Sequence, residues 1–166
     1  MPDHAAGAIV NEFASLSPII LPQKKLQKLA YIAHGWNLAI NDEALICESP
    51  QAWDNGPVFR SVWNAFRDRG WNNGFAKNPD GELYKAVLLK EERAIIDHVW
   101  RRYGELDADE LSDKTHEVGS PWWKAYFGRG RDEPLDDDEI RQHYVDLARA
   151  GRVRRRQEQD GIQANA

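Results

Sequence analysis

Residues 22–40 read PQKKLQKLAYIAHGWNLAI and form the strongest helical pattern of the sequence. Apolar side chains recur in it every three or four positions, which is the spacing of one face of an α-helix. Pro22 suits the first helical turn, because its missing N–H would have no partner there. Gly35 costs about 1 kcal/mol relative to alanine inside a helix, and close approach of another backbone would explain its presence. The expected core-facing stripe is Leu26, Leu29, Ala30, Ala33, Trp36 and Ile40, and the expected outward face is Lys24, Lys25, Gln27 and Lys28.

Shorter helical patterns lie on both sides of this stretch. Pro57 and Pro121 would each open a helix, Ser120 would cap the second of these, and Gly151 would end the last helix. Residues 44–47 and 51–53 are β-like and are separated by a turn-like Glu-Ser-Pro, which predicts a small hairpin. The sequence therefore predicts a mainly α fold, a single-domain helical bundle of about six helices with a small β-hairpin. The further helices are expected over residues 3–16, 57–69, 91–103, 107–117, 121–126 and 136–150.

The last part of the sequence carries two blocks of charge. Six acids lie in residues 132–139, and five arginines lie in residues 149–156. Acids at the start and arginines at the end of one helix complement its macrodipole, at about 0.3–1 kcal/mol per well-placed charge. We assign residues 1–150 to the domain and expect residues 151–166 to form a polar, arginine-rich, flexible tail. The open alternative is an RNA-binding or acid-binding tail made of Arg152, Arg154, Arg155 and Arg156.

Composition narrows the class of protein. The 166 residues carry a net charge of −5 and a single cysteine, Cys47, so an internal disulfide is impossible and a site with several thiolates is excluded. A reducing cytoplasm is the expected location. No apolar stretch approaches the ~20 residues that cross a membrane, and the acidic balance disfavours non-specific nucleic-acid binding. Seven tryptophans are unusual, and we expect one or two of them to contact a partner.

Sequence motifs for catalysis or cofactor binding are absent. The five histidines show no pairing at i and i+4, so we expect no metal site. There is no nucleophile elbow, no P-loop and no dinucleotide fingerprint, so we expect no cofactor and no enzyme activity. One alternative stays open, a small enzyme that uses His116 with Glu117 or Asp113.

Three stretches remain that none of these patterns explains. They read LQKLAYIAHGW at residues 26–36, AWDNGPV at residues 52–58, and THEVGSPW at residues 115–122, the last preceded by Leu111-Ser112. In this order and spacing they resemble the SocA-like antitoxin family, whose domain is also called the Panacea domain and which is related to phage-associated GepA-type proteins. The resemblance covers residues 22–144. It departs from the family pattern at Leu21, where a serine or threonine often precedes the proline.

The resemblance implies an antitoxin of a bacterial or prophage-borne toxin–antitoxin pair. Its partner would be a cognate protein toxin, neutralised by direct contact that covers the toxin or delivers it to an AAA+ protease such as ClpXP. No membrane partner is expected, and nucleic acid is not the expected partner. The residues that we expect to contact the partner are Tyr31, Trp53, Gly56, Pro57, Trp71, His116 and Trp122.

Overall fold

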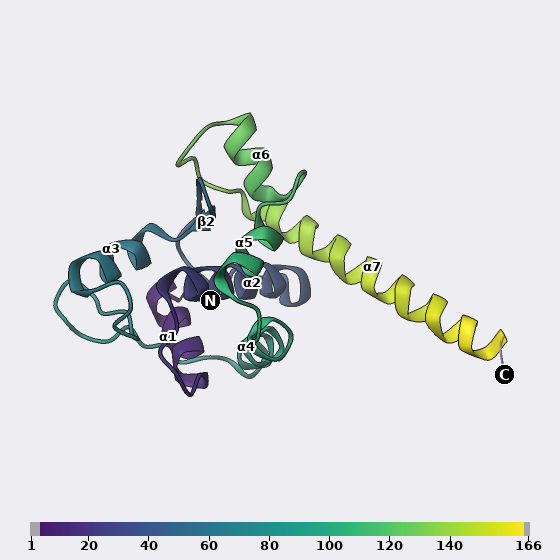
Figure 1. Cartoon of the computed structure of the whole chain (residues 1–166), viewed down its shortest axis with the longest axis horizontal. Helices are drawn as coiled ribbons and strands as arrows, with labels where there is room; N and C mark the ends of the chain where they lie inside the picture. The colour runs from purple at the N-terminus through teal and green to yellow at the C-terminus, as the bar shows by residue number, and fades with distance from the viewer. Residues whose placement is uncertain (1–3, 165–166) are drawn as a thin grey trace.

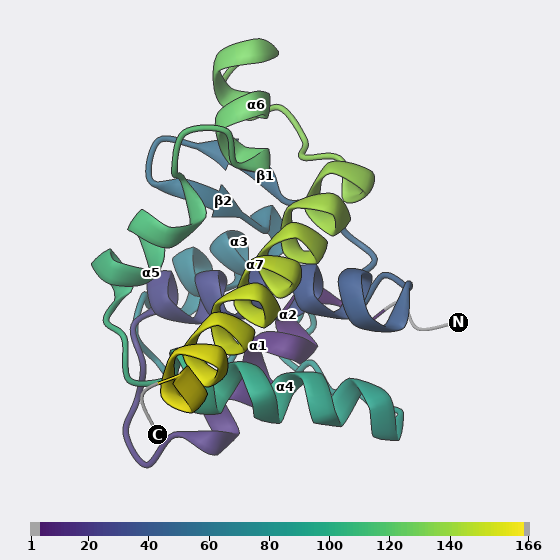
Figure 2. The same cartoon turned by 90° about the vertical axis from the view of Figure 1, so that its right-hand side faces the viewer.

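The computed structural model describes residues 4–164 and is mainly helical. These residues form seven helices and one two-stranded antiparallel sheet, which confirms the predicted class (Figures 1 and 2). None of these helices is both long enough and apolar enough to cross a bilayer. The elements are α1 (Ala6–Leu16), α2 (Gln23–Asn41), β1 (Gln51–Trp53), β2 (Gly56–Val58), α3 (Arg60–Arg69), α4 (Lys90–Tyr103), α5 (Ala108–Thr115), α6 (Pro121–Gly128) and α7 (Asp137–Ala164).

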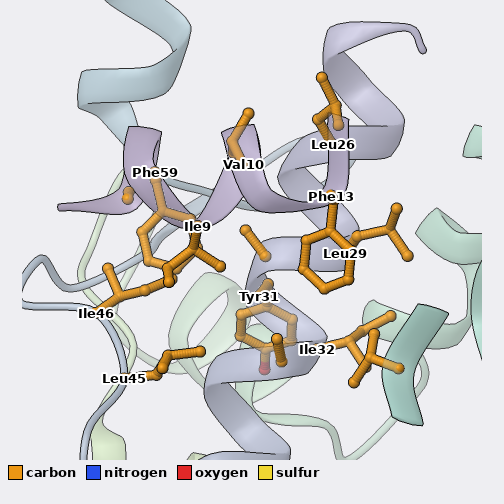
Figure 3. Close-up of a cluster of buried hydrophobic side chains, with 14 of the residues drawn as sticks. Ile9, Val10, Phe13, Leu26, Leu29, Tyr31, Ile32, Leu45, Ile46 and Phe59 are labelled. Carbon is orange, nitrogen blue, oxygen red and sulfur yellow. The ribbon is translucent and has the colours of Figure 1, made fainter. Parts of the chain in front are cut away.

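Helix α2 is the central element, because α1, α4, α5 and α7 all pack against it. Every residue from Lys25 to Leu38 is buried, so α2 has no outward face over this length. The main core lies between α1 and α2 and is closed by Leu45, Ile46 and Phe59 (Figure 3). Burial of this apolar surface is the main stabilising term of the fold.

The predicted outward face of α2 is wrong for three of its four residues. Lys25, Gln27 and Lys28 are 9%, 1% and 1% exposed. Their polar ends reach backbone groups of distant segments, as when Lys25 Nζ donates to the Gly104 carbonyl oxygen at 2.6 Å. A buried polar group is tolerated when it is hydrogen-bonded, and these contacts explain why the helix accepts a polar face inside the protein.

Gly35 marks the place where α7 crosses α2. A Cβ atom built on Gly35 would lie 2.2 Å from Cε2 of Tyr144, far inside van der Waals contact. The close approach predicted from the sequence is therefore real, but it is made by an aromatic ring and not by a backbone. The same ring packs against Trp36, with the ring centroids 5.1 Å apart.

The hairpin pairs different segments from those predicted. Gln51–Trp53 pairs with Gly56–Val58, and Ala52 lies opposite Pro57. Residues 44–47 do not join this sheet, and Ile46 instead forms an isolated parallel bridge with His4. Pro57 thus lies in β2 and does not open a helix. Helix α3 starts three residues later, because Pro57 and Val58 pair with β1. Phe59, just before the helix, donates its N–H to the Gln27 amide oxygen and accepts from the Gln27 amide nitrogen.

The predicted end of the last helix is also wrong. Helix α7 runs through Gly151 to Ala164. A glycine ends a helix most often by taking a positive φ, and Gly151 is not among the glycines that do so. The second half of α7 projects away from the other elements (Figure 1). The assignment of residues 1–150 as the domain stays a prediction.

Candidate functional site

Three helices hold the turn of the hairpin by hydrogen bonds to its backbone carbonyl groups. The carbonyl oxygen of Trp53 accepts a hydrogen bond from Trp122 Nε1 on α6 at 2.6 Å. The carbonyl of Asn55 accepts from Ser112 Oγ on α5 at 2.5 Å. The third bond, to the Pro57 carbonyl, comes from the amine of a lysine on α2. We call these three carbonyl groups and their donors the hairpin hub.

Lys28 supplies that third bond from inside the protein. Its Nζ donates to the Pro57 carbonyl at 2.8 Å and lies against Gly56, where a Cβ atom would come within 3.2 Å of the amine. Gly56 has a φ of +113°, which favours glycine. The pKa of Lys28 is lowered to about 7, chiefly because burial removes water from the amine and to a smaller extent because Lys24 is positively charged.

His116 closes the side of the hub that faces α6. Its Nδ1 donates to the Ser112 carbonyl, since a carbonyl oxygen can only accept, and its ring meets the Trp122 ring edge-on with centroids 5.2 Å apart. Within the described residues no hydrogen bond joins His116 to Asp113 or Glu117. The contacts of His116 are therefore those of a residue that fixes the corner between α5 and α6.

Three tryptophans form a continuous strip on the surface near the hub. The Trp53 and Trp63 ring centroids are 5.4 Å apart, and those of Trp63 and Trp71 are also 5.4 Å apart. Arg60 lies over Trp53 at 6.0 Å and Arg67 over Trp63 at 5.0 Å, which orients the rings by cation–π contact. Trp71 is 45% exposed, and the other two rings are half-buried. We call Trp53, Trp63 and Trp71 the Trp strip.

A cleft of about 440 Å³ adjoins this strip. Trp53 and Trp63 line it together with the first turns of α2 and the hairpin turn. At its rim Asp54 accepts hydrogen bonds from Arg131 Nε at 2.8 Å and from the Tyr126 hydroxyl at 2.7 Å. Arg131 first, and then the Tyr126 hydroxyl, lower the pKa of the Asp54 carboxyl. The rim therefore carries an ion pair between Asp54 and Arg131 beside an aromatic wall.

The structure separates the predicted contact residues into three groups. Trp53 and Trp71 lie in the Trp strip, where a partner can reach them. Tyr31 is 1% exposed and packs in the core, so it offers no contact surface in this conformation. Burial raises the pKa of its hydroxyl above the usual value. The other four residues lie at the hairpin hub. Pro57 and Trp122 belong to it, and Gly56 and His116 lie beside it.

Sequence reasoning missed Trp63, Gln27, Lys28 and Ser112 as members of the site. For Trp63 a signal exists, because Arg60 and Arg67 stand three residues before and four residues after it on one helix face. For Gln27 and Lys28 the sequence shows only two neighbouring polar residues in a helical pattern, which does not indicate that they are buried. Among residues 4–164, no three His, Cys, Asp or Glu side chains group together as metal ligands.

Comparison with known proteins gives the site a context. The model of the family described as "Antitoxin SocA-like, Panacea domain" matches residues 26–123, more than half of the chain. The chain belongs to this family. The matched range starts in α2 and ends in α6, so it contains the hairpin hub and the Trp strip, whereas the arginines of α7 lie outside it.

One SocA-like relative matches over a similar length. "Antitoxin SocA" of Caulobacter vibrioides (strain NA1000 / CB15N) is 29% identical over 124 residues, which are 70% of this chain and 65% of the relative. The match thus spans a little under two thirds of the length of that relative. No solved structure was found to match the chain.

Proposed function

We propose that this chain is an antitoxin that binds and neutralises a cognate protein toxin by direct protein–protein contact. Membership of the SocA-like family supports the class. The observation that carries the mode of action is the Trp strip, because three adjoining tryptophans at the surface are a typical hot spot of a protein interface. Neither the binding nor the neutralisation requires this chain to make or break a covalent bond.

The strip is suited to recognition because two of its three rings, Trp53 and Trp63, are held in place before binding. Trp53 belongs to a hairpin whose backbone is bonded to α2, α5 and α6, so little conformational freedom is lost when a partner settles on it. Trp63 is held between two other rings and Arg67. An interface of standard size needs about 800 Å² on each partner, and the strip with its adjoining cleft would form its centre.

Neutralisation has two forms that differ in the fate of the toxin. In the first, the antitoxin covers the surface that the toxin uses. In the second, it acts as an adaptor that presents the bound toxin to an AAA+ protease such as ClpXP. We expect either encounter in a reducing cytoplasm, in keeping with the single cysteine.

Co-expression with the product of the neighbouring gene tests the proposal. That product should stop growth when expressed alone, and this chain should restore growth and co-purify with it. The half-life of the toxin separates the two forms, because covering leaves the toxin level unchanged whereas delivery shortens its life in cells that contain the protease. A harmless neighbour, or a toxic one that this chain neither binds nor counteracts, would contradict the proposal.

A further inference from the structure

The second half of α7 extends beyond the other helices of the described chain. The side chains of residues 152–161 are all exposed, and Figure 1 shows this part of the helix extending away from the other elements. Figure 2 shows α7 in front of the rest of the described chain, so one side of it is uncovered along its whole length. Helices in proteins owe most of their stability to packing, and this segment has none of its own.

Four arginines share one side of this segment. With 3.6 residues per turn, Arg149, Arg152, Arg155 and Arg156 fall within about a third of the helix circumference. We call them the basic strip. Like charges three or four residues apart on a helix repel one another, so the strip favours a partner that brings negative charge. The rest of the chain is acidic enough to make the whole molecule −5.

The start of the same helix carries the matching charge. Asp138 in its first turn and Glu133 and Asp136 in the segment just before it are exposed and form what we call the acidic cluster. The side chain of Asp138 is 82% exposed although it pairs with Arg141. Helix geometry places Asp138 and Arg152 about 21 Å apart along one straight axis. One side of α7 is thus acidic at one end and basic at the other.

We propose that the basic strip is covered by a second copy of this chain, in a dimer formed by two antiparallel α7 helices. The two-fold axis lies near Val145, and the interface is isologous, with the same surface on both copies. Arg152 of each copy then faces Asp138 of the other, and Arg156 faces the region of Glu133. Arg149 faces Arg141 of the other copy, whose positive charge is met within that copy by Asp42 and Asp138. Val153, 55% exposed, adds apolar contact beside these pairs.

This dimer is independent of the Trp strip. Helix α3 and the projecting end of α7 lie at opposite ends of the molecule (Figure 1). Pairing through α7 uses no residue of the Trp strip, and it approaches the hairpin only at Glu133, whose carbonyl oxygen accepts from the Ala52 N–H. Failure of either proposal leaves the other standing.

Sedimentation of the full chain at about 100 µM tests the dimer. We expect a dimer at about 50 mM sodium chloride and at least about tenfold weaker association at about 500 mM, because salt screens exposed charges. A chain that is monomeric at both salt concentrations would overturn the proposal. Retention of a duplex DNA of about 20 base pairs by a monomeric chain would also overturn it, since the partner of the strip would then be nucleic acid.

Charge exchange locates the surface. Arg152→Glu with Arg156→Glu should give a monomer, and so should Glu133→Lys with Asp138→Lys. An equimolar mixture of the two variants should form a heterodimer, because every reversed charge then meets its complement. Lys77→Glu with Lys85→Glu is the matched control and should leave the dimer intact. A dimer that survives both reversals, or folded variants that stay monomeric when mixed, would place the contact elsewhere.

Discussion

The indole N–H of Trp122 points at the carbonyl oxygen of Trp53, and the two atoms are 2.6 Å apart. This bond joins residues 69 positions apart in the sequence and fixes α6 to the hairpin. The ring of Trp122 is only 5% exposed and stacks on Tyr126, with centroids 4.8 Å apart. Trp122 therefore holds α6 to the hairpin from a buried position, and its contact with a partner stays a prediction.

Trp122→Phe should lower the free energy of unfolding by about 1–3 kcal/mol, because it leaves the Trp53 carbonyl without its donor in a buried place. Urea unfolding followed by circular dichroism measures the loss. Trp123→Phe is the control, since the Trp123 ring is only half-buried and donates no hydrogen bond recorded in the described chain. Equal effects of the two changes would contradict a specific role for the bond.

Lys28→Met should remove a pH dependence of stability. The pKa of Lys28 is lowered from 10.5 to about 7 in the folded chain. Above pH 7 the folded chain releases this proton while the unfolded chain keeps it, so stability rises with pH up to about pH 10, by at most about 1.4 kcal/mol per pH unit.

Urea unfolding of the wild type and of Lys28→Met at several pH values between 7 and about 9.5 measures this slope. The free energy of unfolding of the wild type should rise steadily relative to that of Lys28→Met as the pH rises. Lys85→Met, which removes an exposed lysine that is not on α2, should keep the wild-type slope. A constant difference over this range would show that the Lys28 amine does not lose its proton there.

Gly35→Ala should destabilise the protein by about 1–3 kcal/mol, although alanine is the better helix former, because the new methyl group would overlap the Tyr144 ring. Thermal unfolding checks this. Gly151→Ala is the matched control on the exposed part of α7, where no atom lies within 4 Å of the added carbon, and it should raise stability by up to about 1 kcal/mol. A stabilising effect at both positions would argue against tight packing of α7 on α2.

Trp71→Ala should weaken toxin binding at least about 30-fold while leaving the fold intact, as truncation of a hot-spot residue costs 2 kcal/mol or more. Titration calorimetry with the purified toxin measures the affinity, and growth rescue on co-expression should fall with it. Phe127→Ala removes another aromatic ring, 65% exposed on α6 and outside the Trp strip, and should leave binding unchanged. The opposite ranking of the two variants would move the interface away from the strip.

The helical class and most helix positions followed from local sequence. Ser120 caps α6 as expected, with its hydroxyl accepting from the Trp123 N–H, and Pro121 occupies the first turn. Such signals act over three or four residues, so one stretch of sequence contains all of them. Trp71 lies in a loop and Trp53 ends the predicted strand 51–53 beside a turn, so both could be predicted to lie near the surface.

The surroundings of α2 could not be predicted in the same way. Periodicity reports the apolar side of a helix but not the number of neighbours that pack on its polar side. Gln27 and Lys28 are buried because their partners are backbone groups of Phe59 and Pro57, some 30 residues away. Backbone groups are almost the same in every residue, so the sequence of residues 57–59 gives no sign of these bonds. The choice of hairpin partner was missed for the same reason.

The hairpin hub has a consequence for protein engineering. Its three acceptors are main-chain oxygens, which every amino acid possesses, so the side chains at positions 53, 54 and 58 take no part in those three bonds. Positions 55 and 58, whose side chains make no hydrogen bond within the described residues, can be randomised as a library, whereas Asp54 is kept for its bonds to Arg131 and Tyr126. Selection of such a library against unrelated proteins would turn this small helical scaffold into a source of new binding reagents.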